Sequence, residues 1–486
     1  MVDPRRFLEP PARWASKYRH TVLLQAPDRH IAPMRRVTLF AAVALLAYTA
    51  LAIALYQTVP FLVIVHVGDN GLLPFDFVFW LCAFLLIRAF LRRQAILATP
   101  LLRYVTYIVL FYLAYQVLVV APVAVIKGTY PPIGALYAVT QRFTAVLVLF
   151  FALLLPRYWN PRIVFRLIEI AAVILLIVAL WRLSTGTRVD YDVATGRFRA
   201  LWGGGTLLFG WVLVVRLLRP RLRPQDLLFS LLALAGIVLI NHRSAYIAIA
   251  MSFICYLLTR RRHTIRTVGT VLLVCIIAGL LIVSLVPSLY SGLRYSFGTV
   301  LNPYADTNAS DRITRVGLGL QTFTAYPLGD VFWRAPNMYY IVDLGDSYFE
   351  PHNFAAQLLV KEGVVGTLVW FALLALCLSA SFRNARRDQM SAVLGAYLVF
   401  YLTFCFFNAN FYMTNNVMFL TAPMGLILWR DALLLRKQSA VRQQQASVRY
   451  PLVSMAETGT SFPPTSAFRS REVGLEAEFR DSVHSS

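Results

Sequence analysis

Long uninterrupted runs of apolar residues dominate this sequence and set the strongest limit on its fold. Two examples are FAAVALLAYTALAIALY near the beginning and LLVCIIAGLLIVSLV near the middle. Of the 486 residues, 58% are hydrophobic and 14% charged, and the mean hydropathy is +0.63, which is too apolar for a soluble globular protein. Unbroken apolar runs, rather than amphipathic stripes, predict a polytopic helical membrane protein.

About twelve transmembrane helices can be drawn on these runs, so the predicted fold class is all-α. They lie at roughly 38–57, 75–92, 101–125, 136–156, 163–181, 201–218, 226–240, 245–259, 267–287, 352–378, 390–408 and 413–432. One long loop, 288–351, separates the ninth span from the tenth. The predicted organisation is a basic tail (1–36), a transmembrane domain (37–435) and a second tail (436–486). Because that second tail is rich in Gln, Ser, Thr and Pro, its composition predicts disorder.

Basic residues gather in alternate connections between the predicted spans. The clusters on the side of the N-terminus are RR at 35–36, RAFLRR at 88–93, RYWNPR at 157–162, RPRLR at 219–223, RRRHTIR at 260–266 and RNARR at 383–387. The positive-inside rule places this side and both termini in the cytoplasm. The formal net charge of +23 therefore reflects topology and attraction to anionic membrane lipids. We expect no nucleic-acid binding, because no groove-reading motif accompanies the charge.

The unusual polar residues fall on the opposite, exported side. They occur in four segments: GRFRALWGGG with Arg197 and Arg199, NHRSAY with Arg243, SDRITRVG with Arg312 and Arg315, and EPHNF with Glu350, His352 and Asn353. A guanidinium donates a fork of hydrogen bonds to phosphate and stays charged, and an imidazole can accept a proton near neutral pH. The pattern favours a site that holds a pyrophosphate; anchoring of span ends at the membrane surface is the alternative.

Arg243 follows a span that is too short to cross a membrane. The predicted helices 226–240 and 245–259 fall short of the roughly 20 residues that a bilayer requires. The turn between them would then lie below the membrane surface, where an arginine is costly unless it faces a polar cavity or an anion. Snorkelling of the side chain to the surface is the alternative.

The spacing around His352 resembles that of a known family. His352-Asn353, nine residues, Gly363, two residues and Gly366 match the His-Asn-x9-Gly-x-x-Gly pattern of the O-antigen ligase and polymerase superfamily. SDRITRVGLGLQTFTAYPLGD is similar to the family's Ser-x-Arg segment, helix and Pro-Leu-Gly turn, and NHRSAYIAIA is similar to its entry into the eighth span. GRFRALWGGG stands where the family has Arg-x-x-Gly followed by an Asn motif, which three glycines replace here. The resemblance covers roughly residues 36–435.

This resemblance implies a glycosyltransferase of the bacterial inner membrane, with its active site at the periplasmic face and the loop 288–351 in the periplasm. The donor would be a polysaccharide on undecaprenyl diphosphate. The acceptor would be a hydroxyl of lipid A-core in a ligase, or of a growing polysaccharide in a polymerase. The family requires no metal and no cofactor. The implied roles are a catalytic base for His352, diphosphate binding for Arg243, Arg312, Arg315 and Arg199, and support for Asn353, Glu350, Gly363 and Gly366.

Three other interpretations remain open at this point. A polymerase of O-antigen or exopolysaccharide repeat units would share the scaffold, and a flippase for lipid-linked oligosaccharides would share the span number. Asp190-Tyr191-Asp192 is the Asp-x-Asp pattern with which nucleotide-sugar transferases bind a metal, although it faces the exported side. Glu169 lies three residues after Arg166, so a local ion pair within one helix is the simplest expectation for it.

Overall fold

A computed structural model describes most of the transmembrane region. It describes residues 31–54, 65–67, 70–72, 74–91, 99–126, 143–186, 190–192, 197–199, 201, 203–219, 222–240, 242–259, 269, 307–329, 353–408 and 416–457. The chain divides into two compact units, Met1–Ala432 and Leu433–Ser486. Apart from turns and two short hairpins, the described residues are helical, which confirms the predicted all-α class.

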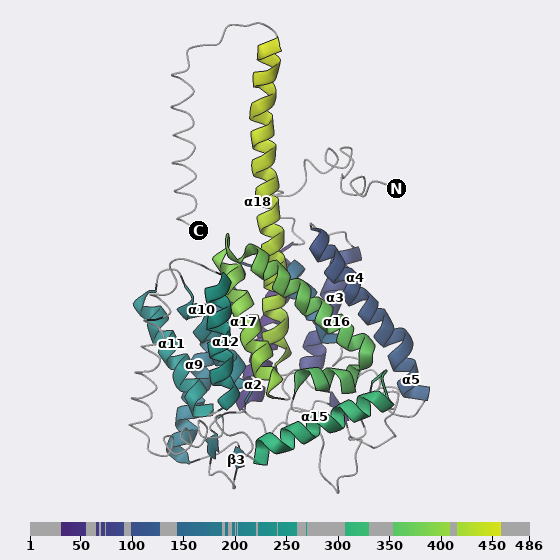
Figure 1. Cartoon of the computed structure of the whole chain (residues 1–486), viewed down its shortest axis with the longest axis vertical. Helices are drawn as coiled ribbons and strands as arrows, with labels where there is room; N and C mark the ends of the chain where they lie inside the picture. The colour runs from purple at the N-terminus through teal and green to yellow at the C-terminus, as the bar shows by residue number, and fades with distance from the viewer. Residues whose placement is uncertain are drawn as a thin grey trace. The chain divides into compact units, whose positions relative to one another are not determined.

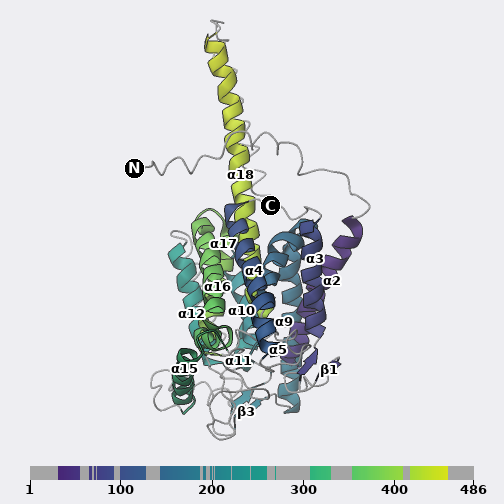
Figure 2. The same ribbon diagram turned by 90° about the vertical axis from the view of Figure 1, so that its right-hand side faces the viewer.

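Most helices of the first unit run side by side as a bundle, and α15 lies obliquely across one end of it (Figures 1 and 2). They are α2 (Ile31–Ala54), α3 (Pro74–Leu91), α4 (Pro100–Tyr115), α5 (Ala121–Ile126), α7 (Val146–Leu149), α8 (Leu155–Tyr158), α9 (Arg162–Thr185), α10 (Gly205–Leu217), α11 (Pro224–Ile240), α12 (Arg243–Thr259), α15 (Thr307–Ala325), α16 (Phe354–Ala385), α17 (Gln389–Phe406) and α18 (Val417–Glu457). Two π-helical segments, η3 (Gln116–Val120) and η5 (Phe150–Leu154), join α4 to α5 and α7 to α8, and a short 3-10 turn, η4 (Phe143–Ala145), precedes α7.

Six of the described helices are long and apolar enough to cross a membrane, which makes the chain a multi-pass membrane protein. They are Pro33–Ala54, Pro100–Ile126, Arg162–Thr185, Phe354–Ala385, Gln389–Phe406 and Val417–Gln443. Eleven of the predicted spans overlap described helices, and the span at 267–287 lies outside the described residues except for Gly269. The total of twelve spans and the position of the long loop stay predictions.

Helix α10 lies at the centre of the bundle. Every residue from Gly205 to Leu217 is buried, and the helix packs against α9, α11 and α17. Its apolar residues surround the helix on all sides, as expected of a helix with no solvent-facing stripe. The Trp211 ring contacts the Tyr397 ring edge-on, with 4.6 Å between centroids. The helices α11 and α12 have 17 residues each and begin two residues before the predicted spans, so both remain below about 20 residues.

The described strands of this unit form two hairpins. Strand β1 (Val65–Val67) pairs with β2 (Asn70–Leu72). Strand β3 (Asp190–Asp192) pairs with β4 (Arg197–Arg199) in an antiparallel register that sets Asp190 opposite Arg199 and Asp192 opposite Arg197. The Asp-x-Asp pattern therefore occupies one strand of a hairpin whose other strand supplies two arginines.

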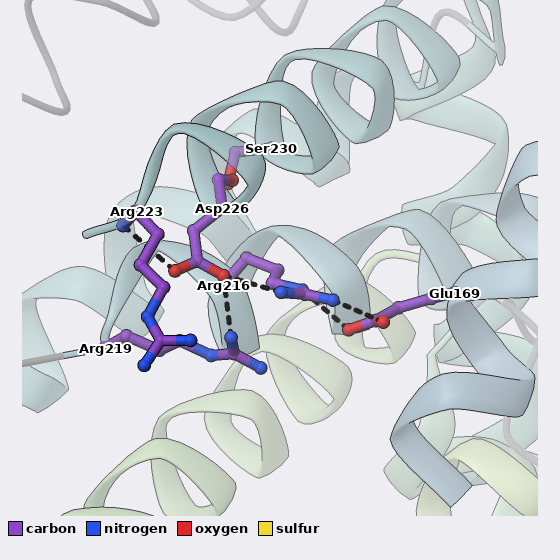
Figure 3. A network of polar contacts seen from close by, with 6 residues as sticks. All are labelled: Glu169, Arg216, Arg219, Arg223, Asp226 and Ser230. Carbon is purple, nitrogen blue, oxygen red and sulfur yellow. Dashed lines mark hydrogen bonds and ion pairs between the residues drawn. The ribbon is translucent and has the colours of Figure 1, made fainter. Parts of the chain in front are cut away.

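Buried ion pairs close one end of the bundle, which we call the ion-pair end (Figure 3). Arg216 at the end of α10 forms a two-bond contact with Glu169 of α9, and its Nη1 donates to Asp226 Oδ1 of α11 at 2.6 Å. The expectation that Glu169 pairs locally with Arg166 is therefore wrong, because the buried carboxylate faces a neighbouring helix. Two further pairs lie at the same end: Arg430–Asp388 at 2.6 Å and Arg383–Asp431 at 2.7 Å.

The second unit begins within α18. That helix continues to Glu457, whereas the composition predicts disorder from residue 436 onward. The helical run is explained by the strong helix formers Leu, Arg, Lys and Gln that fill its first turns beyond residue 432. The remaining tail, after Glu457, lies outside the described residues.

Candidate functional site

The C-terminal turn of α17, Phe404–Asn408, brings two of the predicted motif segments together. Asn353 Nδ2 donates to the Phe406 carbonyl at 3.1 Å, and Arg312 Nη1 donates to the Phe407 carbonyl at 2.8 Å. The last carbonyls of a helix have no partner within it and form the negative end of its dipole, so they attract such donors. Helix α15, which carries Arg312, and the beginning of α16 are thereby joined at one point.

A third motif segment reaches the same turn through a buried side chain. Asn408 is 4% exposed, and its Nδ2 donates to Ser244 Oγ at 2.6 Å and to the Phe404 carbonyl at 2.8 Å. Ser244 directly follows Arg243, which is the first residue of α12. The backbone that carries Arg243 is therefore tied to the α17 C-terminal turn.

The glycine-rich segment that follows Arg199 also lies here. The His242 ring contacts the Phe404 ring edge-on, with 5.6 Å between centroids. A Cβ added at Gly203 would lie 2.6 Å from His242 Nε2, closer than two such atoms can approach. A glycine at position 203 therefore lets the imidazole fit against the backbone that leads into α10. All four predicted segments converge on the α17 C-terminal turn.

Helix α15 presents its arginines on one face. Arg312, Arg315, Gly319 and Thr322 follow helical spacing, and Gly319 and Thr322 are buried. The two arginines on this face are partly buried, whereas Ile313, on a different face, is 64% exposed. The helix lies beside the beginning of α16 in the bundle (Figure 1). Both arginines therefore face the molecule rather than the surroundings.

Helix α16 begins at a cap and is interrupted at Gly363. The Asn353 side-chain oxygen accepts hydrogen bonds from the amides of Ala355 and Ala356, at 2.9 and 3.1 Å. Gly363 has φ 64° and ψ −167°, and the Val364 amide donates to the Pro327 carbonyl at 2.8 Å. An N-terminal segment of about nine residues is thereby set apart from the long remainder of the helix.

The turn Pro327–Gly329 of the long loop occupies this break. A Cβ at Gly363 would lie 2.2 Å from the Leu328 carbonyl carbon. Both the positive φ and this close backbone contact require glycine. The close neighbour of Gly363 is therefore this loop turn rather than another helix.

Glu362, a buried carboxylate that no motif marks, lies beside this break. Its side chain is 2% exposed, and its Oε2 accepts hydrogen bonds from Tyr112 Oη at 2.5 Å and from Gln116 Nε2 at 3.1 Å. A Cβ at Gly366 would lie 2.4 Å from the Glu362 Cβ, so Gly366 makes room for this side chain rather than for another helix. Gln116 opens the π-helical segment η3, and such segments are frequent at functional sites. The signal in the sequence was a carboxylate inside an apolar span.

The structure places the predicted site residues to different extents. Side-chain contacts are described for Arg312, Asn353, Gly363 and Gly366, and Arg315 shares the face of Arg312. For Arg243 and Arg199 the structure describes the backbone, at the beginning of α12 and the end of β4. His352 and Glu350 lie outside the described residues, and His352 directly precedes the cap Asn353.

The arrangement collects basic segments at the end of the bundle that lies opposite the ion-pair end. Helix α17 begins at the ion-pair end, next to Asp388, and ends at Phe406. Helix α16 runs the other way, from Asn353 to Ala385. A polar surface with several arginines at the end of apolar helices suits an anionic group at headgroup depth.

Comparison with known proteins finds a match to a segment that contains part of this site. A family model described as O-antigen ligase matches residues 228–371, which include Arg243, Arg312, Arg315 and the His-Asn-x9-Gly-x-x-Gly pattern. No curated protein shows a significant sequence match to the chain. The matched segment contains most of the motif residues, so this part of the chain is similar to the O-antigen ligase family.

Proposed function

We propose that this protein is a glycan ligase that moves an undecaprenyl-diphosphate-linked polysaccharide to an acceptor hydroxyl, on lipid A-core, at the periplasmic face of the inner membrane. The observation that carries the proposal is the convergence of the four basic motif segments at the α17 C-terminal turn. The family match supports a ligase or polymerase activity. The alternation of basic connections supports an orientation with both termini in the cytoplasm and the loop 288–351 in the periplasm.

The transfer exchanges one bond at the first carbon of the donor sugar. The acceptor oxygen attacks that carbon, His352 takes the proton of the hydroxyl, and the carbon–oxygen bond to the diphosphate breaks. Its electron pair leaves with undecaprenyl diphosphate. Arg243 and Arg312, assisted by Arg315 and Arg199, would bind the diphosphate and stabilise the charge that develops on it. The residues of this chain supply a base and cationic donors, so the step needs no redox partner.

The described contacts support positions for these groups. Asn353 caps α16 and binds the Phe406 carbonyl, which holds the backbone next to His352. Arg312 is held at the neighbouring carbonyl of Phe407. A base and a diphosphate-binding arginine would therefore be anchored to consecutive residues of one helix end. Glu350, just before His352 in sequence, is proposed to shape the acceptor side.

The decisive experiment is complementation of a deletion strain, read out on surface glycans. In a ligase, the deletion removes the attachment of polysaccharide to lipid A-core, and lipid-linked polymer accumulates. If the protein were a polymerase, which is the second candidate within the same family, the deletion strain would instead accumulate single repeat units. If the protein were a flippase, its deletion would leave the lipid-linked glycan on the cytoplasmic side. That result would contradict both transferase activities.

Replacement of His352 by Ala is expected to abolish transfer while expression and membrane insertion stay normal. The physical reason is that the acceptor hydroxyl would lose its base. Replacement of His263, in the basic connection at 260–266, by Ala is the matched control and should retain activity. Transfer by the His352 variant at the wild-type level would remove the base assignment.

Arg243→Lys is expected to lose nearly as much transfer as Arg243→Ala. An ammonium group is a point charge and cannot reproduce the two parallel hydrogen bonds that a guanidinium gives to phosphate. Transfer by both variants would be measured in the same complemented strain at matched protein levels. A fully active Lys variant would indicate that Arg243 supplies charge alone or snorkels to the surface.

A further inference from the structure

The ion-pair end contains more guanidinium donors than its carboxylates can accept. Five charged residues meet there: Glu169, Arg216, Arg219, Arg223 and Asp226 (Figure 3). Arg216 is 9% exposed at its side chain, and Glu169 together with Asp226 takes up its donors. Three arginines face two carboxylates, so the group retains one positive charge.

Asp226 pairs with Arg216 and Arg219 but not with the guanidinium of Arg223. It is fully buried, and its Oδ1 accepts from Arg216 Nη1 at 2.6 Å and from Arg219 Nη1 at 2.7 Å. Its Oδ2 accepts the backbone amide of Arg223 at 3.1 Å rather than that residue's guanidinium. Among the described residues, the Arg223 side chain has no hydrogen-bond or ion-pair partner, and that of Arg219 has this one contact.

The two side chains extend to the same side of Asp226 (Figure 3). Arg223 is exposed and the Arg219 side chain is 36% exposed, so both are accessible from outside the bundle. Burial first, and then repulsion from Arg216 with a smaller part from Arg223, lowers the pKa of Arg219 below its usual value. Neighbouring like charges of this kind are stabilised when an anion binds between them.

The depth of these arginines selects the kind of anion. They lie in the connection between α10, with 13 residues, and α11, with 17. At about 1.5 Å per residue, α10 spans roughly 20 Å against a hydrocarbon core of about 30 Å. The end of a helix this short cannot extend far beyond the hydrocarbon core, so the connection lies close to the depth of the lipid headgroups. It belongs to the basic side that we assign to the cytoplasm.

We propose that Arg219 and Arg223 bind the phosphate of an anionic phospholipid headgroup in the leaflet at the ion-pair end. The guanidinium fork of Arg223 and the unused edge of Arg219 would hold the phosphate oxygens. The Asp226 carboxylate keeps Arg219 in place beside it. This site is separate from the α17 C-terminal turn and does not depend on the proposed transferase activity.

The test is native mass spectrometry of the purified full chain in detergent with added phosphatidylglycerol or phosphatidylcholine. We expect the wild type to retain phosphatidylglycerol preferentially, and Arg219→Gln/Arg223→Gln to lower its apparent affinity about tenfold. The matched control is Arg386→Gln/Arg387→Gln, which removes the same charge from two exposed arginines at the same end. That control should change the affinity less than about twofold, because general attraction to the surface is screened and shared by many groups.

A single variant, Arg223→Gln, keeps the test decisive if the double variant is unstable. Its side chain takes no part in the ion pairs, so folding should be retained while lipid binding weakens. Equal losses in the two double variants, or no preference for phosphatidylglycerol in the wild type, would overturn the proposal. Displacement of the lipid by millimolar inorganic phosphate in the wild type would also overturn it, since the site would then bind free phosphate.

Discussion

The two ends of the helical bundle use their arginines differently. At the ion-pair end, Arg216 lies against the carboxylates of Glu169 and Asp226, and Arg430 against that of Asp388. At the α17 C-terminal turn, Arg312 lies against the Phe407 carbonyl. A carboxylate carries a full negative charge, whereas a helix-terminal carbonyl carries only part of the helix dipole.

This difference in partners changes how far the charge of each arginine is neutralised. A buried arginine between two carboxylates is neutralised, and it serves mainly to align the helices that contribute to the pair. An arginine on a carbonyl is held in position while it retains its positive charge for a ligand. If the proposed diphosphate binding by Arg312 is correct, the two ends differ in whether their arginines remain available to a ligand.

The largest effect is expected at the ion-pair end, from Arg216→Met. The change leaves the buried carboxylates of Glu169 and Asp226 without their main cation, which costs about 3–5 kcal/mol in comparable buried pairs. Thermal unfolding in detergent, followed by circular dichroism, would measure the loss. Arg387→Met is the control, because Arg387 is exposed and should change stability by less than about 0.5 kcal/mol. A variant at position 216 as stable as the wild type would remove the distinction between the two ends.

Gly363→Ala is expected to have the next largest effect, and it acts at the opposite end of the bundle, which contains the α17 C-terminal turn. The added Cβ would lie 2.2 Å from the Leu328 carbonyl carbon, and the positive φ alone costs of order 1–3 kcal/mol. We expect the Pro327–Gly329 turn to leave the break in α16, so that glycan transfer falls at least tenfold. Complementation would report activity, and limited proteolysis would report release of the loop.

The control for that substitution is Gly317→Ala. Gly317 lies in α15 with no atom within 4 Å of an added Cβ, and alanine favours helix by about 1 kcal/mol over glycine. It should be neutral or slightly stabilising. If Gly363→Ala were equally well tolerated and proteolysis were unchanged, the loop turn would not be anchored in the break.

Local patterns in the sequence predicted much of this molecule. Long apolar runs located the helices, and basic connections grouped one set of helix ends. Within the site, the resemblance marked Arg312 and Asn353, each through its own short motif, and both side chains donate to adjacent carbonyls of the α17 C-terminal turn. The short lengths of α11 and α12 could be read directly from the number of residues between polar turns.

Contacts between distant segments could not be predicted from one sequence. The bond from Tyr112 to Glu362 joins residues 250 apart, and that from Asn408 to Ser244 joins residues 164 apart. A buried carboxylate pairs with whichever donor the helix packing brings to it. Glu169 therefore pairs with Arg216 of α10 rather than with Arg166, three residues before it in the same helix. Gly363 was recognised as a motif residue, but its partner lies in a loop whose path no periodicity describes.

The smallest effect that still sharpens the comparison between the two ends is expected at Asn408. If neutral hydrogen bonds hold the end with the α17 C-terminal turn, Asn408→Ala should lower the free energy of unfolding by about 1–3 kcal/mol. The reason is that it leaves the buried Ser244 hydroxyl without its partner. Ser244→Ala should cost less, and the double variant should cost less than the sum of the two.

A double-mutant cycle on thermal stability would measure this coupling, which we expect at about 0.5–2 kcal/mol. The coupling should be insensitive to salt, in contrast to an ion pair, since neither side chain carries a charge. Transfer activity should also fall in the variants that lack this bond, because Ser244 follows Arg243 and its bond to Asn408 fixes the beginning of α12. Strictly additive losses would show that α12 and the α17 C-terminal turn are held in place independently, and the convergence of the motif segments would then rest on α15 and α16 alone.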